Sequence, residues 1–181
     1  MKTASEVPVF CHCSFIDFGY RTTGTTLTDV VFSLFSFHNE TMNIWSHLIG
    51  LVCMITAGIV VIHDLSAIEG NGNVYAVEIF ILSACICFLS STMYHWFGCL
   101  SEACHDNLLV LDLSGVGILI AGSFVPAIYY GFQCVEVARA MHGTLVGFVY
   151  VVGLSAPWIK MKIRGDALTS PNFVQICSIK Y

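Results

Sequence analysis

The stretch VYAVEIFILSACICFLSSTMYHWF, residues 74–97, decides the fold, because it is almost wholly apolar and long enough to cross a membrane as one helix. A hydrocarbon layer about 30 Å thick needs roughly 20 apolar residues in helical form. Three more stretches approach this length, at 44–62, 108–130 and 143–159. The whole chain is 56% hydrophobic and 10% charged, whereas soluble domains average about 25% charged residues. We therefore predict an all-α membrane protein, a helical bundle with about four transmembrane helices.

The segments outside the spans divide the rest of the chain. Residues 1–27 are predicted to form a cytoplasmic N-terminal tail, and residues 160–181 a second cytoplasmic tail. Within 28–43, the apolar residues at 30, 31, 34, 35 and 37 follow a helical stripe, with Thr28 in the position of an N-cap. This pattern predicts a short helix that lies along the inner membrane interface and leads into the first span, so that the membrane bundle covers 44–159.

The basic residues predict the orientation. With four spans both ends of the chain lie on one side, and that side holds every Lys and Arg except Arg139. Cytoplasmic segments carry an excess of basic residues, so both termini are predicted to be cytoplasmic, in the plasma membrane or an endomembrane. Most of the nine cysteines fall within spans or on this reducing side, and no intrachain disulfide is expected.

Two polar residues interrupt the apolar spans at a shared depth. His95 lies near the end of the second span and Asp112 near the start of the third, which places both about 5 to 7 Å below the cytoplasmic interface. Ser91 shares the helix face of His95, one turn deeper. One interpretation is a hydrogen bond between His95 and Asp112, worth about 0.6 kcal/mol in a membrane. The other is a zinc site in which the imidazole binds the metal and the carboxylate ligates, orients the ring or accepts a proton.

Five motifs, GYR, SLFSFHNETMNIWSHLIG, SSTMYH, LDLSG and GSFVPAIYY, follow one another between Gly19 and Tyr130. In order and spacing they resemble the progestin and adiponectin receptor (PAQR) family, in its adiponectin-receptor-like branch. The resemblance implies a seven-span fold with an interior N-terminus, of which this chain would hold four spans. We therefore expect a partial family fold, from a truncated or alternatively spliced product.

The same resemblance implies a zinc ion near the cytoplasmic face. It implies His95 as a metal ligand, Asp112 as the carboxylate that reaches the zinc-bound water, and Ser91 beside it in the SxxxH motif. Asp112 and Ser91 are thereby the candidate catalytic residues. The family's two remaining ligands are histidines of an HxxxH motif, and no two of this chain's seven histidines have that spacing. The zinc site is therefore expected to be incomplete in this chain.

Other potential ligands are interpreted more plainly. Residues 11–13, Cys-His-Cys, are treated as ordinary tail, because three adjacent residues cannot close a tetrahedral site without partners. Cys99, Cys104 and His105 are assigned to a solvated loop rather than to a makeshift metal site.

Three polar residues enter the first span at helical spacing. These are Glu40, Asn43 and His47. We expect packing and helix capping from them rather than direct chemistry.

Three functions remain open. The first is a receptor for an adiponectin-like or lipid ligand, with signalling linked to lipid metabolism. The second is a zinc-dependent, ceramidase-like lipid amide hydrolase, and this chain alone would be inactive as an enzyme because the HxxxH ligands are missing. The third is a catalytically silent subunit that forms homo-oligomers or pairs with full-length relatives among membrane lipids. The chain has neither a phosphate-binding glycine loop nor a basic patch, so no nucleic-acid partner is expected.

Overall fold

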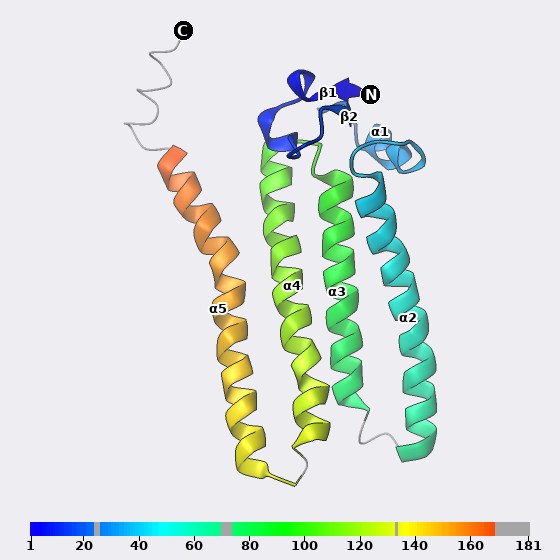
Figure 1. Cartoon of the computed structure of the whole chain (residues 1–181), viewed down its shortest axis with the longest axis vertical. Helices are drawn as coiled ribbons and strands as arrows, with labels where there is room; N and C mark the ends of the chain where they lie inside the picture. Colours follow the sequence, from blue (N-terminus) through cyan, green and yellow to red (C-terminus); the bar gives the residue numbers. More distant parts are fainter. Residues whose placement is uncertain (24–25, 70–73, 133, 169–181) are drawn as a thin grey trace.

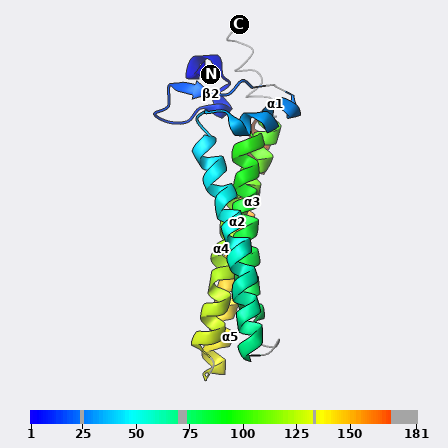
Figure 2. The same cartoon turned by 90° about the vertical axis from the view of Figure 1, so that its right-hand side faces the viewer.

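The computed structural model describes residues 1–23, 26–69, 74–132 and 134–168, and four long helices dominate it. These are α2 (Thr41–Glu69), α3 (Tyr75–Phe97), α4 (Glu102–Gly131) and α5 (Glu136–Leu168). They lie side by side in chain order, with contacts between α2 and α3, α3 and α4, and α4 and α5 (Figure 1). Turned by 90°, they overlap in a narrow column (Figure 2). The predicted bundle is therefore an open row of helices.

Three of the described helices are long and apolar enough to cross a membrane, namely Thr41–Leu65 of α2, all of α3 and all of α4. They confirm the first three predicted spans. The fourth, 143–159, lies within α5, several of whose side chains fall outside the described part of the structure, and its membrane crossing stays a prediction. Both α4 and α5 continue as helix through a proline, Pro126 and Pro157.

The helices are longer than their apolar windows. The first begins at Thr41 instead of 44, and the third at Glu102 instead of 108. Hydropathy detects only the apolar part of a helix, which lies in the hydrocarbon layer. The helix itself extends through polar turns as far as its capping residues. At the start of α4 that cap is Ser101, whose hydroxyl accepts a hydrogen bond from the Cys104 amide at 3.1 Å.

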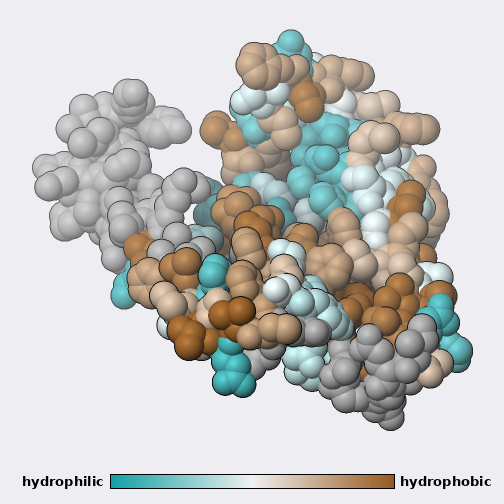
Figure 3. All heavy atoms as spheres, turned by 60° about the horizontal axis from the view of Figure 1, so that its bottom comes forward, coloured by the Kyte–Doolittle hydropathy of each residue, from teal (hydrophilic) through white to brown (hydrophobic). Residues whose placement is uncertain are grey.

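Large apolar side chains cover the outside of the row, as expected for surfaces that face lipid. Figure 3 shows hydrophobic side chains over most of the face in view, with hydrophilic ones gathered mainly in one region. The described core contains several small polar residues, Ser83, Ser90, Ser91, Thr92 and Ser114, each buried. Four of these hydroxyls donate to the carbonyl one turn earlier in the same helix, at 2.6 to 2.8 Å.

The interface between α3 and α4 is close because glycine and serine face each other. A Cβ placed on Gly115 would lie 3.1 Å from the Cα of Cys87, and one on Gly122 would collide with Ser83. Small residues allow this approach between membrane helices, where packing rather than the hydrophobic effect drives association. The LDLSG motif, which ends in Gly115, is thus a packing motif as well as the source of Asp112.

The N-terminal segment folds over one end of the row. It contains a two-stranded antiparallel sheet, β1 (Lys2–Thr3) with β2 (Phe18–Tyr20), and two 3₁₀ turns, η1 (Ala4–Glu6) and η2 (Val9–Cys11). The Tyr20 hydroxyl is enclosed by this segment, donating to the Ile16 carbonyl at 2.7 Å and accepting from the Cys13 amide at 3.0 Å. The predicted N-terminal tail is therefore folded onto the helices, and its cytoplasmic location stays a prediction.

A short helix lies beside the row, as predicted, with different bounds. Helix α1 (Leu27–Phe32) continues into the 3₁₀ turn η3 (Ser33–Phe35). Its N-cap is Thr26 and not Thr28, because the Thr26 hydroxyl and the Asp29 carboxylate bond to each other's backbone amide in a capping box. Two indole N–H groups, from Trp45 and Trp96, donate to the carbonyls of Leu34 and Val30 at 3.1 and 2.8 Å.

This pinned helix leaves large apolar side chains exposed. Those within α1 and η3 include Leu27, Val31, Phe32 and Phe35, and Phe37 is exposed just after them. An apolar fringe at the end of a membrane-spanning row agrees with the predicted interfacial position, which stays a prediction because no membrane is present.

Candidate functional site

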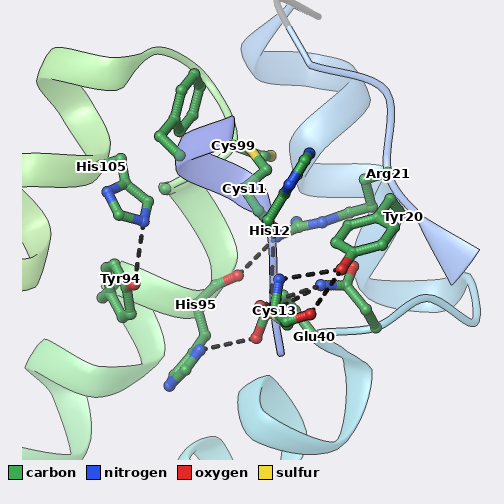
Figure 4. A pocket seen from close by; sticks show the side chains of 13 residues that line it. Cys11, His12, Cys13, Tyr20, Arg21, Glu40, Tyr94, His95, Cys99 and His105 are labelled. Carbon is green, nitrogen blue, oxygen red and sulfur yellow. Dashed lines mark hydrogen bonds and ion pairs between the residues drawn. The ribbon is translucent and has the colours of Figure 1, made fainter. Parts of the chain in front are cut away.

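A polar cavity of about 210 Å³ lies where the N-terminal segment covers the ends of α2, α3 and α4 (Figure 4). Its lining comes from three parts of the chain: residues 10–21, the two residues before α2, and the region from the end of α3 to the first turns of α4. The charged and titratable members are Cys11, His12, Cys13, Tyr20, Arg21, Glu40, Tyr94, His95, Cys99 and His105. The structure thus gathers side chains that the sequence spreads over nearly a hundred positions.

His95 is bound to Glu40 in this cavity. Its Nδ1 lies 2.8 Å from Oε2 of Glu40, and both side chains are about four-fifths buried, with 19% and 18% exposed. The interpretation that His95 is hydrogen-bonded to Asp112 is therefore corrected. Glu40 precedes α2 and reaches across to the last turn of α3, whereas Asp112 belongs to the third long helix.

A second layer lies deeper in the row. The imidazole of His47 stacks on that of His95, with ring centroids 5.7 Å apart and planes 5° from parallel. The Asp112 carboxylate interacts electrostatically with His47 and Tyr94. Ser91 is buried one turn before His95 on α3. The predicted site residues therefore share one end of the row, with His47 added.

The Glu40 carboxylate is held by four donors. Oε1 accepts from Asn39 Nδ2 at 3.2 Å and from the Cys13 thiol at 3.5 Å, while Oε2 accepts from Asn43 Nδ2 and from His95, both at 2.8 Å. Burial by itself raises the pKa of Glu40, but these hydrogen bonds and the His95 charge outweigh it and bring the pKa to about 2. Glu40 is therefore a carboxylate at neutral pH.

Arg21 closes the end of α3. Its guanidinium donates to the carbonyls of His95 and Trp96 at 2.6 and 2.8 Å, and to the Ser33 hydroxyl at 3.1 Å. The last carbonyls of a helix lack partners within it, and a cation there also complements the negative end of the helix dipole. Arg21 thus fixes the backbone that carries His95. The GYR motif places Arg21 directly after a strand that pairs with the chain's beginning.

His38 supports the same corner as a neutral ring. Its Nδ1 accepts from the Glu40 amide at 3.2 Å, so its Nε2 carries the proton and donates to the Ser33 carbonyl at 3.2 Å. Burial, and after it the nearby charge of Arg21, lower the pKa of His38 to about 4. The ring is therefore uncharged under physiological conditions.

Three thiols line the cavity, from Cys11, Cys13 and Cys99. Burial raises the pKa of each, that of Cys11 to about 11, so all three are protonated at neutral pH. Cys99 is buried, and His105 is bonded to the Tyr94 hydroxyl at 3.1 Å. Assigning Cys99 and His105 to a solvated loop is therefore wrong, because the N-terminal segment covers that loop.

The side chains around the cavity were compared with what a metal site needs. In the described ranges, no three His, Cys, Asp or Glu side chains group closely enough to hold a metal ion. His95 has its Nδ1 bonded to Glu40 and presents its other nitrogen away from it (Figure 4). These residues do not by themselves fit a complete zinc site.

Sequence reasoning missed Glu40 and Arg21 as members of this site. A signal existed for Glu40: an acidic side chain one residue before a long apolar helix is costly unless it is paired. For Arg21 the only signal in the sequence was its position in the GYR motif. No local pattern joins residue 21 to residues 95 and 96.

The comparisons with known proteins agree with this fold. Residues 35–178 match the model of the family described as haemolysin-III related. Heptahelical transmembrane protein 1 of Arabidopsis thaliana is 32% identical over 136 residues, 71% of this chain and 41% of that protein. Progestin and adipoQ receptor family member 3 of Homo sapiens is 36% identical over 108 residues, 56% of this chain and 34% of that protein.

The Adiponectin receptor protein of Drosophila melanogaster is 30% identical over 122 residues, 67% of this chain and 28% of that protein. The chain therefore spans between a quarter and a half of the length of these curated relatives.

Proposed function

Because the chain belongs to the haemolysin-III-related family, which includes the progestin and adipoQ receptors, we propose that it forms part of a receptor-like multi-pass membrane protein. Its ligand would be a lipid or an adiponectin-like protein, and its signal would concern lipid metabolism. The functional centre would be the polar end of the row, where His95 and Asp112 lie.

The observation that carries this proposal is the buried Glu40–His95 pair beneath the N-terminal segment. Ionisable groups within membrane-spanning helices, such as His95 of α3, are costly, and they commonly mark a ligand or proton pathway. The stacked His47 ring and the Asp112 carboxylate extend the pair inward. A ligand headgroup entering between the helices would meet this polar layer, while its apolar part would remain among the lipid-facing side chains.

The test uses the chain reconstituted in phosphatidylcholine nanodiscs. A long-chain fatty acid and a ceramide are each added, and the unfolding temperature is recorded for the wild type and for His95→Ala. We expect stabilisation by one of these lipids that His95→Ala abolishes. The control is His63→Ala, at the opposite end of α2, which should respond like the wild type. Equal responses of wild type and His95→Ala would refute a lipid receptor role for this site.

A second function, a zinc-dependent lipid amide hydrolase, is favoured by one feature. Histidines that bind metals usually donate their other ring N–H to a carboxylate, and His95 is bonded to Glu40 in this way. The described residues supply too few ligands for tight binding. We therefore expect the purified chain to carry well under one equivalent of zinc and to leave ceramide intact. Stoichiometric zinc that is lost in His95→Ala would instead support the hydrolase.

The orientation is part of the same proposal. The N-terminal segment and the end of α5 lie at the same end of the row (Figure 1). With the basic residues concentrated on that side, we propose that both termini are cytoplasmic. Tags at Met1 and at Tyr181 should both be protected from protease on intact cells.

A catalytically silent role would show as co-purification with a full-length relative, without any response to lipid or zinc.

A further inference from the structure

The carboxylate of Glu40 accepts a hydrogen bond at each of its acceptor sites. A carboxylate has about four lone-pair sites, and in Glu40 two donors meet each oxygen. The four donors come from the N-terminal segment, from the turn before α2, from α2 and from α3. The carboxylate therefore cannot rotate to release one donor without disturbing the other three.

The charge of Glu40 restricts the protonation of His95. A carboxylate only accepts hydrogen bonds, so the His95 nitrogen that lies 2.8 Å from it must carry a proton. In the neutral ring the Nδ1–H form is then favoured, and Nε2 keeps a free lone pair. Figure 4 shows the second ring nitrogen pointing away from Glu40. The ring of His47 stacks on the face of the same imidazole.

We propose that Glu40 is the positioning residue of His95: it fixes the Nδ1–H tautomer and the ring orientation, so that Nε2 is the nitrogen offered to a ligand. Sequence and family resemblance assigned His95 and Asp112, and neither assigned this role to Glu40. The inference rests on the proposed function of His95, but it concerns the ring itself and can be tested without any ligand.

The proposal also connects the N-terminal segment to the site. The Cys13 thiol and the Asn39 amide bind the oxygen of Glu40 that His95 does not use. They hold the carboxylate plane and so direct Oε2 at the imidazole. Displacing residues 9–21 would remove the Cys13 donor and leave that oxygen to Asn39 alone.

The experiment is nitrogen NMR of the chain labelled with ¹⁵N-histidine in micelles at pH 8. The His95 signals are identified by their loss in His95→Gln. In the wild type we expect a protonated Nδ1 and an unprotonated Nε2, with this tautomer favoured at least about tenfold by a hydrogen bond to a charged group. A dominant Nε2–H tautomer overturns the proposal without any variant.

Substitutions of Glu40 test whether this residue causes the tautomer preference of His95. Glu40→Gln preserves the shape but loses the charge, and we expect the tautomer preference to fall several-fold. Glu40→Asp keeps the charge on a shorter side chain and should recover part of the preference. Glu78→Gln, near the opposite end of α3, is the control and should leave the His95 signals unchanged. A wild-type tautomer ratio in Glu40→Gln would overturn the proposal, whereas failure of lipid or zinc binding would count only against the proposed function.

Discussion

The polar end and the apolar middle of the row are held together by different forces. At the polar end, directional hydrogen bonds join distant parts of the chain, as in the bonds of Arg21 to the carbonyls of His95 and Trp96. In the middle, α3 and α4 approach through small residues such as Gly115 and Gly122. The comparison teaches that the end should be sensitive to charge and pH, and the middle to side-chain volume.

The largest expected effect is at the polar end. Arg21→Ala removes three hydrogen bonds and leaves the carbonyls of His95 and Trp96 without this partner. We expect the free energy of unfolding in detergent to fall by about 3 kcal/mol. Arg21→Lys should recover only part of this, since one ammonium cannot reproduce the guanidinium fork. Lys162→Ala serves as a charge control, and an equal effect of both alanine variants would contradict the capping role.

The middle of the row should respond to a single methyl group. In Gly122→Ala the new Cβ collides with Ser83, so we expect a loss of about 1 to 3 kcal/mol in unfolding free energy. The matched control is Gly147→Ala on α5, where no atom lies within 4 Å of the new Cβ. That variant should be neutral or gain up to about 1 kcal/mol from helix propensity. If the two variants behave alike, the close α3–α4 interface is wrong.

Acid should weaken the polar end before the middle. The pKa of His38 is lowered from 6.5 to about 4 by burial, so the unfolded chain binds more protons between these values and stability falls as the pH drops through them. His38 is only about half buried, so we expect a loss of about 1 kcal/mol. Glu40, whose pKa is lowered to about 2, contributes stability that is lost only as the pH falls below about 4.5. Thermal unfolding from pH 7 to 4 should lose this slope in His38→Gln, and an unchanged slope would assign it to another group.

The smallest expected effect is that of Asp112→Ala. Because Glu40 and not Asp112 holds Nδ1 of His95, removing Asp112 should cost no more than about 0.6 kcal/mol. Glu40→Ala should cost more, since it releases four donors at once. Chemical denaturation of both variants in one detergent decides the order. A larger loss for Asp112→Ala would move the centre of the site from the α2 entry to α4.

Residue patterns in the sequence were sufficient to predict three spans, but they predicted the contacts of the candidate site less well. Three spans and the family were predicted correctly, because hydropathy over about 20 residues and the order of motifs are properties of the chain alone. His95, Asp112 and Ser91 were predicted to share one depth, and they lie at one end of the row. The interpretation that joined His95 to Asp112 by a hydrogen bond was wrong, since shared depth leaves undetermined which of several polar side chains the ring faces.

The sequence by itself determined that this protein lies in a membrane, which stretches form the apolar parts of its long helices, and which polar residues belong near one interface. Only the tertiary structure decided the partners. It folded residues 1–23 over the helix ends, brought Arg21 to the carbonyls of α3, and placed Glu40 rather than Asp112 at His95. The physical reason is that burial in lipid depends on the composition of a local segment, whereas a hydrogen bond depends on the relative position of two segments far apart in the chain.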